Sequence, residues 1–175
     1  MKHKILIVDD EVENLRALER IFRKEHEVLT ASSAVEALGA LESHDVALLI
    51  CDQRMPEMSG IELLSRTVSL RPHMVRILLT GYTDVKSLIE AINCGHVYKY
   101  VTKPWNNEEL MVTVSRALQH YQATKSRHNL QMENDRLRAR LSEIADLAVG
   151  GDELLSHTVI GPVVRDQELD AVSAS

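Results

Sequence analysis

The sequence has 175 residues, 45% of them apolar and 26% charged, and a formal net charge of −6, which is typical of a soluble globular domain with some chain left over. The acidic balance and the two cysteines exclude a globally basic nucleic-acid-binding protein and a disulfide framework. No apolar run reaches the roughly 20 residues that span a bilayer, and the N-terminal run is too short for a signal peptide, so we expect a cytoplasmic protein with no membrane partner.

The first 45 residues alternate short apolar runs with helical patterns. Residues 4–8 form a continuous apolar run rich in β-branched residues, which is typical of a strand covered on both faces. Residues 27–31 predict a second strand. Ser33 and Glu36 have the spacing of a helix capping box. The apolar faces predicted for the two helices are Leu15, Leu18, Ile21 and Phe22 for the first and Val35, Leu38 and Leu41 for the second.

The same alternation continues to about residue 121. Further strands are predicted at 46–51, 76–81 and 97–101, and further helices at about 61–68, 84–93 and 107–121. Strand–helix alternation repeated five times predicts an α/β fold with a doubly wound, five-stranded parallel sheet and right-handed crossovers. In such a sheet, the functional crevice lies at the carboxyl ends of the strands.

Polar side chains stand at or just after the ends of four of the predicted strands, at that carboxyl edge. They are Asp9 and Asp10, Asp52, Thr80, and Lys103. Three clustered carboxylates repel one another unless a cation lies among them, and hard oxygen ligands with room for water suit Mg²⁺. A carboxylate beside Mg²⁺ and a lysine is well placed to receive a phosphoryl group, because this transfer needs mainly positioning and charge neutralisation.

These residues resemble the receiver domain of bacterial two-component response regulators. The matching motifs are Asp9-Asp10-Glu11, Asp52, Met55-Pro56 with Gly60, Thr80-Gly81, and Tyr100 with Lys103-Pro104. The resemblance covers residues 1 to about 122. The stretches DQRMP at 52–56 and YVTKPW at 100–105 resemble a narrower subgroup, in which the receiver often precedes a helical linker and a transcriptional or cyclic-dinucleotide output module.

The resemblance implies a flavodoxin-like receiver fold and a role for each matching position. Asp52 would accept a phosphoryl group from a phosphohistidine on a sensor histidine kinase or a phosphotransfer protein. Asp10 would bind Mg²⁺ directly together with Asp52, and Asp9 would bind it through water. The backbone carbonyl of Arg54 would complete the protein ligands of the metal.

The resemblance also implies a switch. Lys103 would pair with the phosphoryl group, and the Thr80 hydroxyl would move toward it. Tyr100 would rotate inward. The face formed by the fourth helix, the fifth strand and the fifth helix would then change and alter dimerisation or the binding of a downstream protein partner.

The chain beyond the fifth strand predicts one long helix. Neither proline nor glycine occurs between Trp105 and Gly150, so the helix can run from about 107 to 149, with a stop at Gly150-Gly151. The continuation places apolar residues in heptad register, with Asn134 at an a position, which favours a parallel dimeric coiled coil. The predicted seam is Leu130, Asn134, Leu137, Leu141 and Ile144.

The pattern of this helix is also compatible with two other interpretations. It can instead be a single amphipathic helix that packs back on the preceding domain. Its basic residues are interleaved with acidic ones, which is typical of a solvated face, so direct DNA binding is not expected.

The sequence therefore predicts three segments: a receiver at 1–122, a helical extension at 123–149 and an acidic tail at 150–175. The leading hypothesis is a response regulator with no catalytic output domain, a homodimer switched by phosphorylation. One alternative is the receiver and linker of a longer regulator. Another is a Mg²⁺-dependent phosphatase, which we consider weaker because Asp52 follows the third predicted strand and the nucleophile of such enzymes follows the first.

Overall fold

A computed structural model describes residues 2–81 and 97–155, and side chains as far as residue 147. The predicted helix at 84–93 and most of the predicted acidic tail lie outside the described residues. Contacts divide the chain into two compact units, Met1–Asn129 and Leu130–Ser175. The three segments predicted from charge and motifs stay a prediction.

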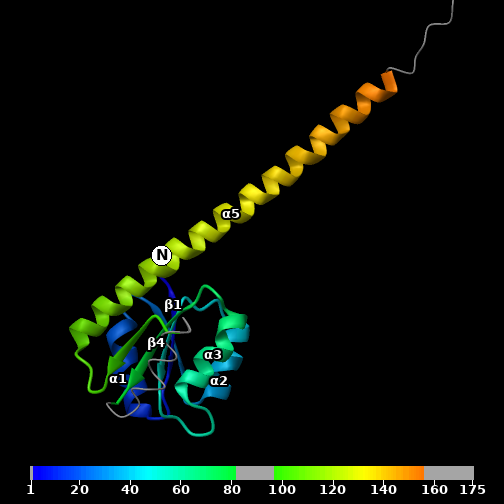
Figure 1. Cartoon of the computed structure of the whole chain (residues 1–175). Helices are drawn as coiled ribbons and strands as arrows, with labels where there is room; N and C mark the ends of the chain where they lie inside the picture. The colour runs from blue at the N-terminus through cyan, green and yellow to red at the C-terminus, as the bar shows by residue number, and fades with distance from the viewer. Residues whose placement is uncertain (1, 82–96, 156–175) are drawn as a thin grey trace, which may run out of the picture. The chain divides into compact units, whose positions relative to one another are not determined.

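A parallel sheet forms the centre of the first unit (Figure 1). Its strands are β1 (Lys4–Val8), β2 (Glu27–Ala31), β3 (Leu48–Asp52), β4 (Val75–Thr80) and β5 (Lys99–Thr102). They pair in parallel in the order β2-β1-β3-β4-β5. The predicted five-stranded, doubly wound sheet is confirmed, and the strand order reverses at β1 and β3, which makes their carboxyl ends the topological switch point.

Helices cover both faces of the sheet (Figure 1). α1 (Val12–Phe22) and the first turns of α5 (Asn107–Leu155) pack on one face, and α2 (Ala34–Ser43) and α3 (Gly60–Leu70) pack on the other. The first core includes Ile5, Ile7, Leu18, Phe22, Leu110, Val114 and Leu118. The second includes Leu6, Val8, Ala37, Leu41, Leu63 and Leu64. Successive residues of β1 enter opposite cores, as the pleat of a strand requires.

The start of α2 differs from the prediction in two ways. Val35 is 66% exposed, and Ala34 and Ala37 are buried in its place. The Ser33 hydroxyl accepts from the Glu36 backbone N–H at 3.2 Å, as predicted. The Glu36 carboxylate, however, accepts from the backbone N–H and hydroxyl of Ser32, so the two residues do not form the reciprocal box.

The complete capping box lies at the start of α3, where none was predicted. The Ser59 hydroxyl accepts from the Glu62 N–H at 3.3 Å, and the Glu62 carboxylate accepts from the Ser59 N–H at 2.9 Å. Both bonds satisfy N–H groups that a helix N-terminus otherwise leaves without a partner. The box fixes the point at which the loop after β3 becomes helix.

A buried arginine joins β4 to the end of α3. The Arg76 guanidinium donates to the hydroxyl and carbonyl oxygens of Thr67, both at 2.8 Å, to the carbonyl of Arg71 at 2.7 Å and to that of Met74 at 2.6 Å. Burial lowers the pKa of Arg76 to about 10. Because a helix C-terminus carries partial negative charge and unpaired carbonyls, this cation acts as the cap of α3.

Beyond its first turns, α5 contacts the edge of the sheet opposite the strands' carboxyl ends. The Lys125 ammonium donates to Asp45 and to the Tyr121 hydroxyl, both at 2.8 Å. The Gln122 amide lies 2.7 Å from the His3 ring nitrogen. Residues 121–125 of α5 therefore belong to the first unit and pack against this edge of the sheet.

The predicted stop at Gly150-Gly151 is wrong, because α5 continues to Leu155. Each glycine costs a helix only about 1 kcal/mol relative to alanine, and it keeps the N–H and C=O that helical hydrogen bonds need. A glycine ends a helix only when it adopts the left-handed conformation that a C-terminal cap requires. In the described part of the chain, no helix combines the length and apolar character needed to cross a membrane.

Candidate functional site

Three predicted site residues stand at the carboxyl edge of the sheet because the strand ladder continues through them. Asp9 follows β1, and its N–H donates to the carbonyl of Ala31 at 3.2 Å. Asp52 is the last residue of β3. Lys103 follows β5, and its N–H donates to the carbonyl of Thr80 at 2.8 Å. Their backbones are therefore held in place by the hydrogen bonds of the sheet.

The Lys103 ammonium lies between the two carboxylates. Its Nζ is 2.9 Å from Asp9 Oδ2 and 2.5 Å from Asp52 Oδ1. The exposed fraction is 0% for Asp9 and 5% for Asp52. Burial by itself would lower the pKa of Lys103, but the bonds to Asp52 and Asp9 outweigh burial and raise that pKa. Lys103 therefore stays charged and is the cation between two buried anions.

The pKa of Asp52 is subject to opposing effects. Burial raises the pKa of its carboxyl, while the bonds from Lys103 and from the Arg54 N–H, at 2.6 Å from Oδ2, act against that rise. The pKa of Asp52 is raised overall, so its ionised carboxylate is less well stabilised here than in water. A further cation close to Asp52 would stabilise its ionised form.

Asp9 is held by groups from the start of α1. The Glu11 N–H donates to Asp9 Oδ1 at 2.9 Å, and the Asn14 amide lies 3.2 Å from Oδ1 and 3.1 Å from Oδ2. Sequence reasoning missed Asn14. The available signal was its place in the first turns of the helix that directly follows the two aspartates.

The loop after β3 is anchored by Gln53 and by a close approach at Gly60. The Gly60 N–H donates to the Gln53 carbonyl at 3.0 Å, and the Ile61 N–H donates to the Gln53 side-chain oxygen at 3.2 Å. A Cβ placed on Gly60 would lie 2.2 Å from the backbone oxygen of Asp52. Gln53 was also missed by sequence reasoning, because nothing in its spacing shows that its side chain is buried.

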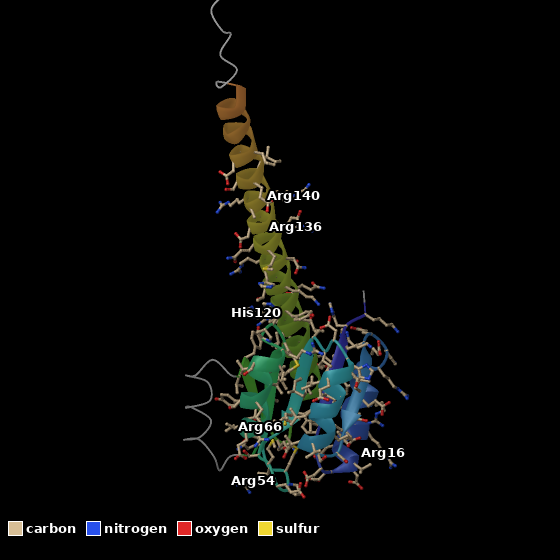
Figure 2. The ribbon with its side chains drawn as sticks, turned by 90° about the vertical axis from the view of Figure 1, so that its right-hand side faces the viewer. Arg16, Arg54, Arg66, His120, Arg136 and Arg140 are labelled. Carbon is tan, nitrogen blue, oxygen red and sulfur yellow. The ribbon has the colours of Figure 1, made fainter. Side chains whose placement is uncertain are left out.

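Within the described residues, neither Thr80 nor Tyr100 forms a hydrogen bond with the carboxylate of Asp9 or Asp52. Thr80 is buried at the same edge, and its hydroxyl donates to the carbonyl of Gly81 at 3.0 Å. Tyr100 is 44% exposed. Arg54 lies at one end of this unit and His120 at the other (Figure 2), which shows how far the site is from the edge that α5 contacts.

The predicted Mg²⁺ ligands do not form a cluster of side chains within the described residues. Asp10 is exposed, and within residues 2–81 and 97–147 no three His, Cys, Asp or Glu side chains are grouped so that they could hold a metal ion. The predicted ligands Asp9, Asp10, Asp52 and the Arg54 carbonyl stay a prediction.

The second unit exposes the predicted seam. Its large apolar side chains are exposed, and the Asn134 amide donates to the Leu130 carbonyl at 3.0 Å. Arg136 and Arg140 extend from the same helix (Figure 2). The exposed apolar seam residues are Leu130, Leu137, Leu141 and Ile144. Exposure leaves them available for a partner, and the coiled coil stays a prediction.

Known proteins resemble the first unit. The family model of the response regulator receiver domain matches residues 5–115. The hydrogenase transcriptional regulatory protein HoxA of Bradyrhizobium diazoefficiens is 41% identical over 121 residues, which are 69% of this chain and 25% of HoxA. The chain thus spans about a quarter of the length of the first curated relatives it matches.

Solved structures agree with this match. A CheY-like response regulator receiver domain protein from Methanospirillum hungatei has a TM-score of 0.67 and 31% identity, over 71% of this chain and 99% of that one. NtrX from Brucella abortus has a TM-score of 0.68 and 27% identity, over 74% of this chain and 30% of that one.

Proposed function

The chain belongs to the family of response regulator receiver domains, and from this premise we propose that it accepts a phosphoryl group on Asp52 in a two-component phosphorelay. The observation that carries the proposal is the Lys103 ammonium bound between two buried carboxylates at the switch point of the sheet. The donor would be a phosphohistidine on a sensor histidine kinase or a phosphotransfer protein.

The chemistry follows from the placement of Asp52. A carboxylate oxygen attacks phosphorus, the O–P bond forms as the P–N bond of the phosphohistidine breaks, and the imidazole leaves. Lys103, 2.5 Å from Asp52 Oδ1, pairs with an oxygen of the transferred group. The Arg54 N–H holds the other oxygen of Asp52. Positioning and charge neutralisation of this kind account for most of the catalysis in phosphoryl transfer.

The donor set fits Mg²⁺. Two buried carboxylates share one lysine, so the edge keeps negative charge, and Asp10 and the Arg54 carbonyl supply further hard oxygens. Mg²⁺ keeps several waters and needs only one or two carboxylates, so a group of three side chains is not required. When bound by Asp10, Asp52 and the Arg54 carbonyl, with Asp9 acting through water, the ion would neutralise charge on the transferring phosphoryl oxygens.

The switch would run from Thr80 to β5. The Thr80 hydroxyl must give up its bond to the Gly81 carbonyl to reach a phosphoryl group. Thr80 pairs in register with Thr102, and its carbonyl accepts from the Lys103 N–H. Movement of Thr80 would therefore act on the strand that carries the exposed Tyr100, whose side chain would turn inward.

The output would be carried by α5. The exposed seam of the second unit is an apolar stripe that a second copy would cover, with Glu133 at a g position opposite Arg138 of the other helix at e. Light scattering with Mg²⁺ and beryllofluoride tests whether phosphorylation controls dimerisation, because beryllofluoride mimics the phosphoryl group on the aspartate. A mass that doubles supports switched dimerisation, and a dimer whose mass does not change places the switch in surfaces that bind a downstream protein.

The second candidate is that the chain is the receiver and linker of a longer regulator. It is favoured by the match to HoxA, which covers only a quarter of the length of that protein. In such a regulator, α5 would link the receiver to an output module, and the complete reading frame of the source gene decides between the two.

The phosphoacceptor is tested by labelling with acetyl phosphate and Mg²⁺. Asp52→Ala should abolish incorporation, because the attacking oxygen is gone. Asp45→Asn is the matched control, since Asp45 lies at the opposite edge of the sheet and contacts Lys125; it should label like the wild type. Labelling that persists in Asp52→Ala would reject Asp52 as the acceptor.

A further inference from the structure

Asn14 is the one neutral side chain bonded to the carboxylates of this site among the residues that the structure describes. Its amide nitrogen is 3.2 Å from Asp9 Oδ1 and 3.1 Å from Oδ2. The other partners of Asp9 each reach a single oxygen: the Glu11 N–H reaches Oδ1, and Lys103 reaches Oδ2. Asn14 therefore spans both oxygens of a carboxylate that has no exposed surface.

This contact constrains the orientation of the carboxylate. The terminal torsion of an aspartate has a broad preference, so the side chain alone does not fix the plane of its two oxygens. A donor that reaches both oxygens from α1, together with the Glu11 N–H, keeps Oδ2 directed at Lys103. Because Lys103 also binds Asp52, the orientation of Asp9 affects where the lysine stands beside the phosphoacceptor.

The chemistry of an amide suits this position. A lysine or arginine would neutralise the edge and oppose a divalent cation, whereas an acidic residue would repel Asp9. An asparagine satisfies buried oxygens and leaves the negative charge of the site unchanged. Asparagine is also a weaker helix former than alanine inside α1, so intrinsic helix propensity does not account for it.

From this geometry we infer that Asn14 is a positioning residue for the phosphoacceptor site, which acts through Asp9 to set the site's affinity for Mg²⁺. The inference rests on the proposed function. Outer partners of metal-binding carboxylates are typically worth 10- to 100-fold in metal affinity. We expect Asn14→Ala to bind Mg²⁺ about 10-fold more weakly than the wild type does.

The measurement is a Mg²⁺ titration of the full chain. Trp105 is the only tryptophan and stands two residues from Lys103, so its fluorescence is the first readout. The rise of the melting temperature with Mg²⁺ concentration gives the same dissociation constant independently. Asn129→Ala is the matched control, because Asn129 is exposed on α5, and its affinity should equal that of the wild type.

A double-mutant cycle separates positioning from a general structural role. In an Asp9→Asn background, Asn14→Ala should change Mg²⁺ affinity by less than twofold, because the carboxylate through which it acts is gone. An equal loss in both backgrounds, or an Asn14→Ala protein that binds Mg²⁺ like the wild type, overturns the inference. A wild type that responds to Mg²⁺ in neither readout rejects the metal site of the proposed function, and the inference falls with it.

Discussion

The Gly60→Ala substitution should destabilise the fold through close contacts with the backbone of Asp52, the proposed phosphoacceptor, and with Leu78. The added Cβ would lie 2.2 Å from the backbone oxygen of Asp52 and 2.8 Å from Cδ1 of Leu78. The oxygen must move by about 0.8 Å to reach even 3.0 Å, a separation that real Cβ atoms rarely go below. It belongs to the last residue of a fully buried strand, so the strand cannot yield without disturbing its neighbours.

The expected cost has two parts. Overpacking a well-packed site costs about 1–3 kcal/mol. Displacing α3 also weakens the bond from the Gly60 N–H to the Gln53 carbonyl, worth about 1 kcal/mol. We therefore expect Gly60→Ala to lower the free energy of unfolding by about 3 kcal/mol, which moves a urea midpoint by roughly 2 M for a protein of this size.

Gly39 provides the matched control, because a Cβ there would meet nothing within 4 Å. It lies inside α2, so Gly39→Ala should stabilise the protein by about 0.5–1 kcal/mol through helix propensity alone. Urea unfolding of both variants gives the comparison, and acetyl phosphate labelling of Gly60→Ala should be slower than in the wild type. A Gly60→Ala protein as stable as the wild type would refute the reasoning from the close approach.

Three further predictions concern other contacts. Arg76→Met should lower the free energy of unfolding in urea by about 2–4 kcal/mol, because it leaves buried acceptors at the end of α3 without a donor. A smaller loss of stability in Arg76→Lys than in Arg76→Met would show that the charge contributes, and equal losses would contradict a role of the charge. The hydrogen bond from Lys125 lowers the pKa of Asp45. The stabilisation from this pair is therefore present above the unfolded pKa of Asp45, near 4, and is lost as pH falls through its folded pKa. Lys125→Met should remove this acid-dependent part of the free energy of unfolding, a change of less than 1 kcal/mol because the pair is exposed. Asn134→Leu should strengthen self-association in sedimentation equilibrium and relax its register, since a buried Asn at an a position trades stability for specificity; an unchanged dissociation constant would place Asn134 outside the seam.

Much of the sheet could be predicted because its strands are simple patterns. The boundaries of β1 and β2 agree with the prediction, and those of β3, β4 and β5 differ by at most two residues. In a parallel sheet, continuous apolar runs are buried on both faces, so hydrophobicity alone locates them. The contact of Lys103 with Asp9 and Asp52 follows from the same logic, because parallel strands end at one edge.

The features that could not be predicted from the sequence depend on the direction in which side chains point. Val35 fits a helical period, but the helix buries Ala34 and Ala37 against the sheet, and Val35 faces solvent. Asn14 and Gln53 are polar residues whose roles appear only when a turn of helix or a loop folds over the edge. The continuation of α5 past Gly150 reflects a backbone choice that composition does not determine, because glycine is compatible with both outcomes.

The Lys103 bridge joins residues that are 94 positions apart in the chain. Closing such a long interval costs loop entropy that only a folded sheet repays. A ribosome that has made Asp52 has not yet made the lysine that completes its surroundings, and a truncated or misfolded chain cannot supply it. If Asp52 is the phosphoacceptor, as proposed, it becomes competent only when β5 and Lys103 are in place, so a signalling network loaded with nascent or damaged copies would not lose phosphoryl groups to them.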